Sequence, residues 1–191
     1  MSSLNESKNP LNNTTYLEQS GIDEVHTWLC HFGSSGMLPA LLDIADDILS
    51  EHWLVLLGEL WVSFDNIGLH GYDLFWAIHE RVPDMDSVIR ELMNDEERMA
   101  FEALPEQITI YRGCGPKNIF GFSWSLDRKI AAKFSFSSRY RTEEPKLLTA
   151  TISKYRAAAL KLARREQEVI VFDYPDERSI HWTEEPLLTP C

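Results

Sequence analysis

The chain has 191 residues, of which 44% are hydrophobic, and its formal charge at pH 7 is −12. This composition excludes a disordered chain, and the length suffices for one well-filled core with a lobe added to it. Its three cysteines, Cys30, Cys114 and Cys191, are odd in number and far apart, which excludes a disulfide framework. The first residues are polar and no run of about 18 apolar residues exists. We therefore expect a cytoplasmic protein without a signal peptide or a membrane span.

The charge is distributed unevenly along the chain. Residues 1–111 hold 4 basic and 20 acidic side chains, residues 112–165 hold 13 and 3, and residues 166–191 hold 1 and 7. The balances are −16, +10 and −6. The basic middle either attracts a polyanionic ligand or pairs with the acidic segments of the same chain, and the sequence leaves both open.

The first half of the chain has the period of helices. Residues 1–18 are polar and predict a flexible arm, and apolar residues then recur at three- and four-residue steps through about residue 103. We predict helices over 22–32, 38–49, 53–64 and 74–82. A further helix over 88–93, with Asp86 as its cap, continues or restarts at 94–97 and is closed by Leu104 and Pro105. The Trp and Phe residues of this helical lobe lie at helical spacing, which indicates core packing. His26, Cys30 and His31 lie on neighbouring turns, but a third and a fourth ligand are missing, so we predict no metal site.

The second half has the alternation of strands. Residues 108–113 alternate apolar and polar side chains and predict a half-buried strand that ends in Arg112 and Gly113. Residues 121–125 predict a short strand with Ser123 and Ser125 on one face. We further predict a short helix over 130–134 with Asp127 as its N-cap, a loop over 135–146, strands over 147–152, 166–172 and 179–182, and a short helix or an irregular basic connection over 155–163.

Three features of this half could carry chemistry. The planar fork of an Arg at a strand end suits a phosphate, although an ordinary surface Arg beside a turn glycine fits these residues as well. A Ser-x-Ser pair is usually the polar face of a strand, and a Glu-x-Glu pair is usually solvated charge. The spacing of Glu166 and Glu168 predicts that both face one pocket from the same side of an extended strand.

Taken together, these pieces resemble a known family. Tyr-Arg-Gly at 111–113, Phe-Ser-Trp-Ser at 122–125 and Glu-Gln-Glu-Val-Ile-Val at 166–171 resemble, in order and spacing, the Arg-Ser-Glu class of cholera-toxin-like mono-ADP-ribosyltransferases. The resemblance covers about residues 104–175. It implies an α+β fold in which the helical lobe, residues 19–103, precedes a mixed β-sandwich core, residues 104–191, within a single integrated domain. Trp124 departs from the family, which usually has a hydroxyl residue there.

The resemblance also implies roles for individual residues. Glu168 would stabilise the oxocarbenium-like transition state formed when the bond between nicotinamide and ribose in NAD breaks. Arg112 would anchor the diphosphate, and the Gly113 backbone would bind the nicotinamide amide. Ser123 would orient Glu168, and Glu166 would attract an arginine acceptor and take its proton.

The resulting prediction is an enzyme that uses NAD as a co-substrate and no metal. Its catalytic residues would be Glu168, Glu166, Ser123 and Arg112, and its NAD-binding residues Arg112, Gly113, Ser123 and Glu168. Ser125 is expected to be structural. Phe134 and Tyr140 could stack on nicotinamide or adenine, but core packing is at least as well supported for Phe134, and neither is included.

Three functions stay open. The first is transfer of ADP-ribose to a protein, with arginine as the expected acceptor and nicotinamide as the product. The second is transfer to a nucleic acid, which the basic Arg164 and Arg165 favour and the overall acidity disfavours. The third is a catalytically silent interaction module. Enzymes of this family commonly serve as bacterial or phage toxins and effectors, so a bacterial or host cytosol and an inhibitory or immunity partner are further expectations, with no membrane involved.

Overall fold

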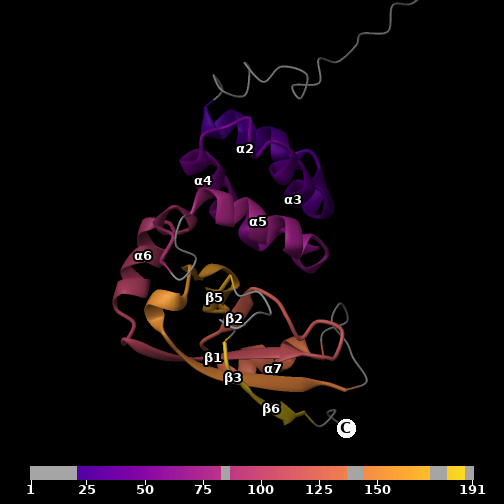
Figure 1. The fold of residues 1–191 in the computed structure, drawn as a ribbon, viewed down its shortest axis with the longest axis vertical. Helices are drawn as coiled ribbons and strands as arrows, with labels where there is room; N and C mark the ends of the chain where they lie inside the picture. The colour runs from indigo at the N-terminus through magenta and orange to yellow at the C-terminus, as the bar shows by residue number, and fades with distance from the viewer. Residues whose placement is uncertain (1–20, 83–86, 137–143, 173–179, 188–191) are drawn as a thin grey trace, which may run out of the picture. The chain divides into compact units, whose positions relative to one another are not determined.

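The computed structural model describes residues 21–82, 87–136, 144–172 and 180–187 (Figure 1). The expected arm over residues 1–18 lies outside these ranges. The chain divides into two compact units, one ending at His70 and the other beginning at Gly71. Helices and an antiparallel sheet together make the fold α+β, as the sequence predicts.

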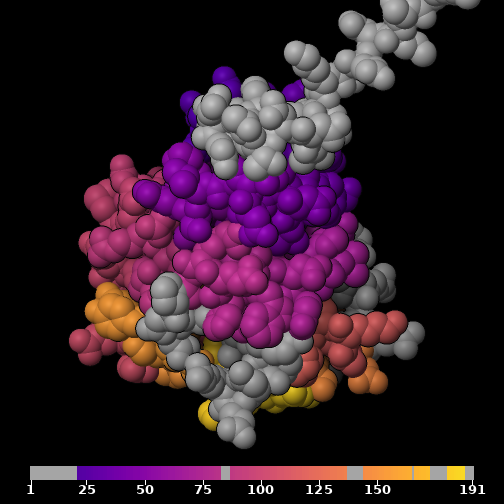
Figure 2. Space-filling view, turned by 45° about the horizontal axis from the view of Figure 1, so that its top comes forward, coloured from indigo at the N-terminus to yellow at the C-terminus, as the bar shows by residue number. Residues whose placement is uncertain are grey.

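The first unit is helical. Its elements are α2 (Ile22–Cys30), α3 (Gly33–Asp43), α4 (Ser50–Leu60), η2 (Trp61–Ser63) and η3 (Ile67–His70). Trp53 and Trp61 are almost completely buried, and the Trp53 indole nitrogen donates to the carbonyl oxygen of Leu41 at 2.8 Å. Core packing is therefore confirmed for both tryptophans. Figure 2 shows the outer side chains of the first of these helices, in indigo, on the face in view.

The α3 helix begins five residues earlier than the predicted start at residue 38. Gly33 has a φ of 66°, a left-handed conformation that suits glycine and reverses the chain directly between α2 and α3. The predicted end near residue 49 is also too late, because α3 ends at Asp43 and Leu49 is already the N-cap of α4. The predicted helix is thus confirmed in existence but shifted toward the N-terminus.

The second unit begins with the helices α5 (Gly71–Arg81), η4 (Arg90–Leu92) and α6 (Asp95–Glu102). Asn94 and Glu97 form a capping box, in which each side chain accepts from the backbone nitrogen of the other at 2.9 and 3.1 Å. The helix predicted over 88–93 shrinks to the single turn of η4. The reason is that the nitrogen of Ile89 donates to the carbonyl oxygen of Ala158 instead of entering a helix.

The sheet has six strands in the order β4-β5-β2-β1-β3-β6. They are β1 (Gln107–Cys114), β2 (Ser123–Ser125), β3 (Lys146–Ser153), β4 (Ala159–Lys161), β5 (Glu168–Ile170) and β6 (Thr183–Pro186). The helix α7 (Arg128–Phe134) follows β2, and its predicted N-cap is confirmed, because the Asp127 carboxylate accepts from the nitrogens of Lys129 and Ile130 at 2.7 and 3.1 Å. Short turns, η5 (Lys154–Arg156) and η6 (Ala163–Arg165), follow β3 and β4.

The expected mixed β-sandwich is not what the described strands form. They join into one sheet in which all pairings are antiparallel. The short strand β2 explains the difference, because it pairs with β5 on one edge and with β1 on the other. It thereby joins β4 and β5 on one side to β1, β3 and β6 on the other within one sheet.

Two further strand predictions need correction. The strand β4 falls within residues 155–163, where a short helix or an irregular connection was expected. The last strand lies at Thr183–Pro186 instead of 179–182, of which only residues 180–182 are described. Within the described ranges, no helix is long and apolar enough to cross a membrane.

Candidate functional site

A row of directly opposed residues crosses four strands of the sheet. Lys161 on β4 pairs with Glu168 on β5, Glu168 pairs with Ser125 on β2, and Ser125 pairs with Tyr111 on β1. Residues directly opposite one another in antiparallel strands project from the same face. The four polar side chains therefore share one face, and Trp124, paired with Val169, projects from the other as expected.

The backbone conformation that positions Glu166 beside Glu168 differs from the one that the sequence predicted. The strand β5 begins at Glu168, and Glu166 has helical backbone angles, with φ −89° and ψ −13°. Gln167 between them has a φ of 45°, which is uncommon for a residue other than glycine. The prediction that both carboxylates face one side of an extended strand is therefore wrong in its geometry. A tight turn, not strand alternation, positions Glu166.

The carboxylate of Glu168 nevertheless influences that of Glu166. Burial raises the pKa of Glu166 above its ordinary value, and the neighbouring negative charge of Glu168 raises it further. Arg164 opposes this shift through its positive charge. A carboxylate whose pKa is raised binds a proton more readily, which suits a general base.

Ser125 holds the turn that carries Glu166. Its Oγ donates to the carbonyl oxygen of Glu166 at 2.8 Å and accepts from the nitrogen of Asp127 at 3.0 Å. The nitrogen of Leu126 donates to the carbonyl oxygen of Gln167 at 3.1 Å. Ser125 is only 4% exposed, so these contacts support the structural role expected for it.

Ser123 lies two positions before Ser125, at the start of β2. It pairs with Ile170 and is therefore the diagonal neighbour of Glu168, not its direct partner. Diagonal neighbours are roughly 7–8 Å apart, which long side chains can bridge. Its predicted role in orienting Glu168 stays a prediction.

Arg112 is brought next to Ser123 by contacts that involve the backbone. Its Nη1 donates to the carbonyl oxygen of Ser123 at 2.6 Å, and its Nη2 donates to that of Asn118 at 3.0 Å. A Cβ atom on Gly121 would lie 2.2 Å from Nη2. The half-buried guanidinium therefore holds the loop between β1 and β2 in place, a role that the sequence did not indicate.

Gly113 lies inside β1, opposite Leu147, and not at a turn as we expected. A Cβ atom there would lie 1.9 Å from the carbonyl oxygen of Ala131 on α7. The close approach that requires glycine is thus made by this helix. The predicted contact between the Gly113 backbone and nicotinamide stays a prediction.

The structure also shows how part of the basic segment is compensated. The Arg128 guanidinium lies 2.7 Å from both carboxylate oxygens of Glu185, and the Lys146 ammonium lies 2.8 Å from Glu184. Hydrogen bonding to Lys146 lowers the pKa of Glu184 below its ordinary value. Arg128 and Lys146 are therefore paired with acidic residues of the same chain, which is one of the two alternatives that the sequence left open for the basic segment.

Several residues near the site were missed or fall elsewhere. Tyr111 and Lys161 belong to the polar row, but only strand register identifies them. Phe134 is half-buried on α7, and Tyr140 lies outside the described residues. Across the described ranges, no group of three or more His, Cys, Asp or Glu side chains gathers to hold a metal ion.

No protein-family model matches the chain, and neither a curated protein nor a solved structure matches it significantly. The geometry of the site therefore carries the functional conclusion.

Proposed function

We propose that the protein is an NAD-dependent mono-ADP-ribosyltransferase that modifies a protein, with arginine as the preferred acceptor. One observation carries the proposal. Arg112, Ser123 and Glu168 sit on β1, β2 and β5, and these strands are neighbours in the sheet in the order β5-β2-β1. Ser123 and Glu168 project from one face of these strands, whereas Arg112, which follows Tyr111 directly, projects from the other face and contacts the loop between β1 and β2.

The first chemical step breaks the bond between the nicotinamide nitrogen and C1′ of the ribose in NAD. The bonding electrons leave with nicotinamide, and positive charge develops on C1′ and the ring oxygen. The half-buried carboxylate of Glu168, fixed at the start of β5, stabilises this charge. Its place between Ser125 and Lys161 on a hydrogen-bonded strand supports a fixed orientation.

The second step joins C1′ to a nitrogen of the acceptor. A guanidinium must lose one proton to become nucleophilic, and the carboxylate of Glu166 accepts it. The raised pKa of Glu166 and its position beside Glu168 both favour this role. The negative charge of Glu166 also attracts a cationic acceptor, which supports arginine.

A protein acceptor is preferred to a nucleic acid because of the ion pairs described above. Arg128 and Lys146 are paired with acidic residues of the same chain. Charges that are already paired contribute less to a polyanion site, and the chain as a whole carries −12.

The test is incubation of the purified protein with NAD labelled in its adenylate part, together with a cell lysate. A parallel reaction contains the Glu168→Gln variant. The products are then digested separately with protease and with nuclease. The proposal predicts label that protease removes and that the variant does not produce; label that only nuclease removes would make the acceptor a nucleic acid. Equal labelling by the two proteins would contradict the assignment of Glu168.

A further inference from the structure

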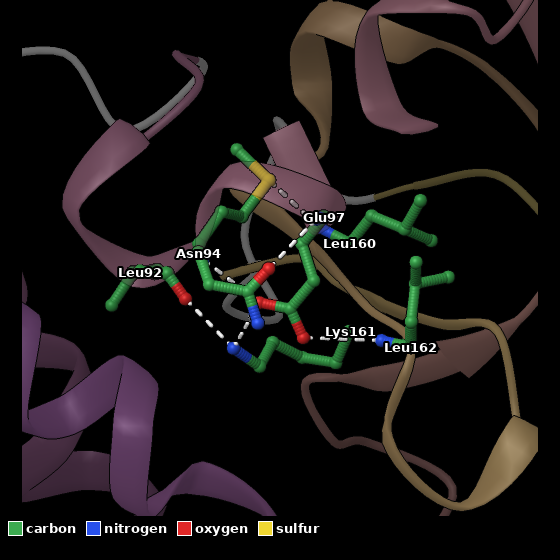
Figure 3. A network of polar contacts seen from close by, with 7 residues as sticks. Leu92, Asn94, Glu97, Leu160, Lys161 and Leu162 are labelled. Atoms are coloured by element: carbon green, nitrogen blue, oxygen red, sulfur yellow. Dashed lines mark hydrogen bonds and ion pairs between the residues drawn. The ribbon is translucent and has the colours of Figure 1, made fainter. Parts of the chain in front are cut away.

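Lys161 is the direct neighbour of Glu168, yet its ammonium is bound elsewhere. The two residues are opposed partners across β4 and β5 and project from one face of the sheet. The Lys161 Nζ instead donates to Glu97 Oε2 at 2.6 Å and to the carbonyl oxygen of Leu92 at 2.9 Å (Figure 3). Both charged side chains are deeply buried, with Glu97 3% and Lys161 6% exposed.

The Glu97 carboxylate is itself held in place. The backbone nitrogen of Asn94 donates to Oε2 at 3.1 Å, and that of Leu162 donates to Oε1 at 3.2 Å. Figure 3 shows the carboxylate lying between the N-terminus of α6 and the end of β4. With donors from both elements, Glu97 is a fixed anion on which Lys161 is retained.

The segment over residues 89–97 covers the free edge of β4. The carbonyl oxygen of Ala158 accepts from Ile89, the nitrogen of Leu160 lies 3.3 Å from the Met93 sulfur, and the nitrogen of Leu162 donates to Glu97. Alternate backbone groups of an edge strand are thus satisfied by residues 89–97. Lys161 therefore lies between this segment and β5, within reach of an acid on either side.

Whether the Lys161 ammonium pairs with Glu97 or with Glu168 matters for the proposed chemistry. Opposed residues in antiparallel strands have Cβ atoms about 4.5–5.5 Å apart, so a lysine side chain easily reaches a partner glutamate. An ammonium ion paired with Glu168 would neutralise the carboxylate that stabilises the developing positive charge. A buried ammonium cannot stay unpaired without a large cost.

We propose that Glu97 is a positioning residue that holds the Lys161 ammonium away from Glu168, so that this ammonium does not neutralise the Glu168 carboxylate. The inference rests on the proposed function, because it assumes that Glu168 acts on the ribose of NAD. It assigns a function to the buried ion pair of Glu97 and Lys161, and neither residue was among those that the resemblance implied.

The test compares variants that break the same ion pair from opposite sides. Glu97→Met leaves an ammonium opposite Glu168, whereas Lys161→Met removes it. The measurement is the rate of nicotinamide release at saturating NAD, per folded molecule, below the unfolding temperature of each variant. We expect about a tenfold or larger loss for Glu97→Met, a rate within about twofold of the wild type for Lys161→Met, and recovery in the double variant.

A merely structural role for the pair gives a different pattern, because both single variants would then lose activity to the same extent. Equal losses, or a double variant as slow as Glu97→Met, would overturn the inference. If Glu97→Met does not fold, Glu97→Gln takes its place, with the same comparison against Lys161→Met and the same expected direction.

Failure of the proposed function is recognised separately. If the wild-type protein and Glu168→Gln release nicotinamide equally or not at all, the proposed function fails and the inference fails with it. If Glu168→Gln alone is inactive and the two ion-pair variants behave alike, only the inference fails.

Discussion

The Oγ of Ser125 donates a 2.8 Å hydrogen bond to the carbonyl oxygen of Glu166, so the buried strand β2 fixes the turn that carries the second carboxylate. Arg164 and Gln167 flank Glu166 with φ values of 58° and 45°. Non-glycine residues adopt such angles only where the surrounding structure maintains them, and Ser125 is part of that structure.

Replacement of Ser125 by alanine should therefore destabilise the protein. The carbonyl oxygen of Glu166 and the nitrogen of Asp127, both in part-buried hydrogen bonds, would each lose a partner, at a cost of about 1–3 kcal/mol. Urea unfolding measures this directly. Ser123→Ala is the matched control and should cost clearly less; an equal loss in both variants would argue against a special role for Ser125.

Gly113→Ala should be among the most damaging single changes. The new methyl group would lie 1.9 Å from the carbonyl oxygen of Ala131, so α7 must move or β1 must bend, at about 3 kcal/mol or more. Gly71→Ala is the control within the same unit, because its methyl group would make only ordinary contacts with Phe122 at 3.7 Å. Thermal unfolding of the two variants should differ by many degrees, and similar melting temperatures would contradict the packing described.

Arg112→Lys keeps the positive charge but loses the planar fork. A lysine cannot donate to the carbonyl oxygens of Ser123 and Asn118 in the same geometry, so we expect a loss of about 1–3 kcal/mol in stability. NAD binding should weaken as well, because the loop between β1 and β2 loses its support. Calorimetric titration with NAD and urea unfolding together test this, and a variant unchanged in both would place Arg112 outside the site.

Glu166→Gln should separate transfer from hydrolysis. Loss of the proposed base removes transfer to the acceptor, whereas release of nicotinamide to water continues. Comparison of labelled acceptor with released nicotinamide measures both, and equal loss of the two would assign Glu166 another role.

The same variant has a pH signature. The pKa of Glu166 is raised in the folded protein, so the folded state binds the proton more tightly than the unfolded state does. The associated stability is fully present below the unfolded value near 4.5 and is lost as the pH rises through the higher folded value. Glu166→Gln should therefore match the wild type at low pH and be more stable by less than about 1 kcal/mol at neutral pH. A gain that is larger at low pH would contradict this sign.

The elements with strong local signals were predictable from the sequence. Alternation of apolar and polar side chains located β1, and Asp127 marked the start of α7. Asn94 and Glu97 stand three positions apart at the start of an acidic helical turn, which is the spacing of a capping box. In these cases the residues that determine the element are close together in the sequence.

The features that the sequence did not predict depend on distant contacts. The strand β4 is only three residues long, and its Lys161 is buried through an ion pair with Glu97, 64 positions away. The turn at Glu166 depends on Ser125, and the need for glycine at Gly113 depends on α7. Strand register, which no local pattern specifies here, is what brings Lys161, Glu168 and Ser125 into one row.

The most direct test of the proposed function is the release of nicotinamide from NAD by the purified protein, measured beside Glu168→Gln. The substitution keeps the size of the side chain, and a half-buried position tolerates it, so the circular dichroism spectrum and the melting temperature should be nearly unchanged. We predict that the wild type releases nicotinamide and that the variant is slower by a factor of about 100 or more. Equal release by two equally folded proteins would contradict the assignment of Glu168 and, with it, the proposed function.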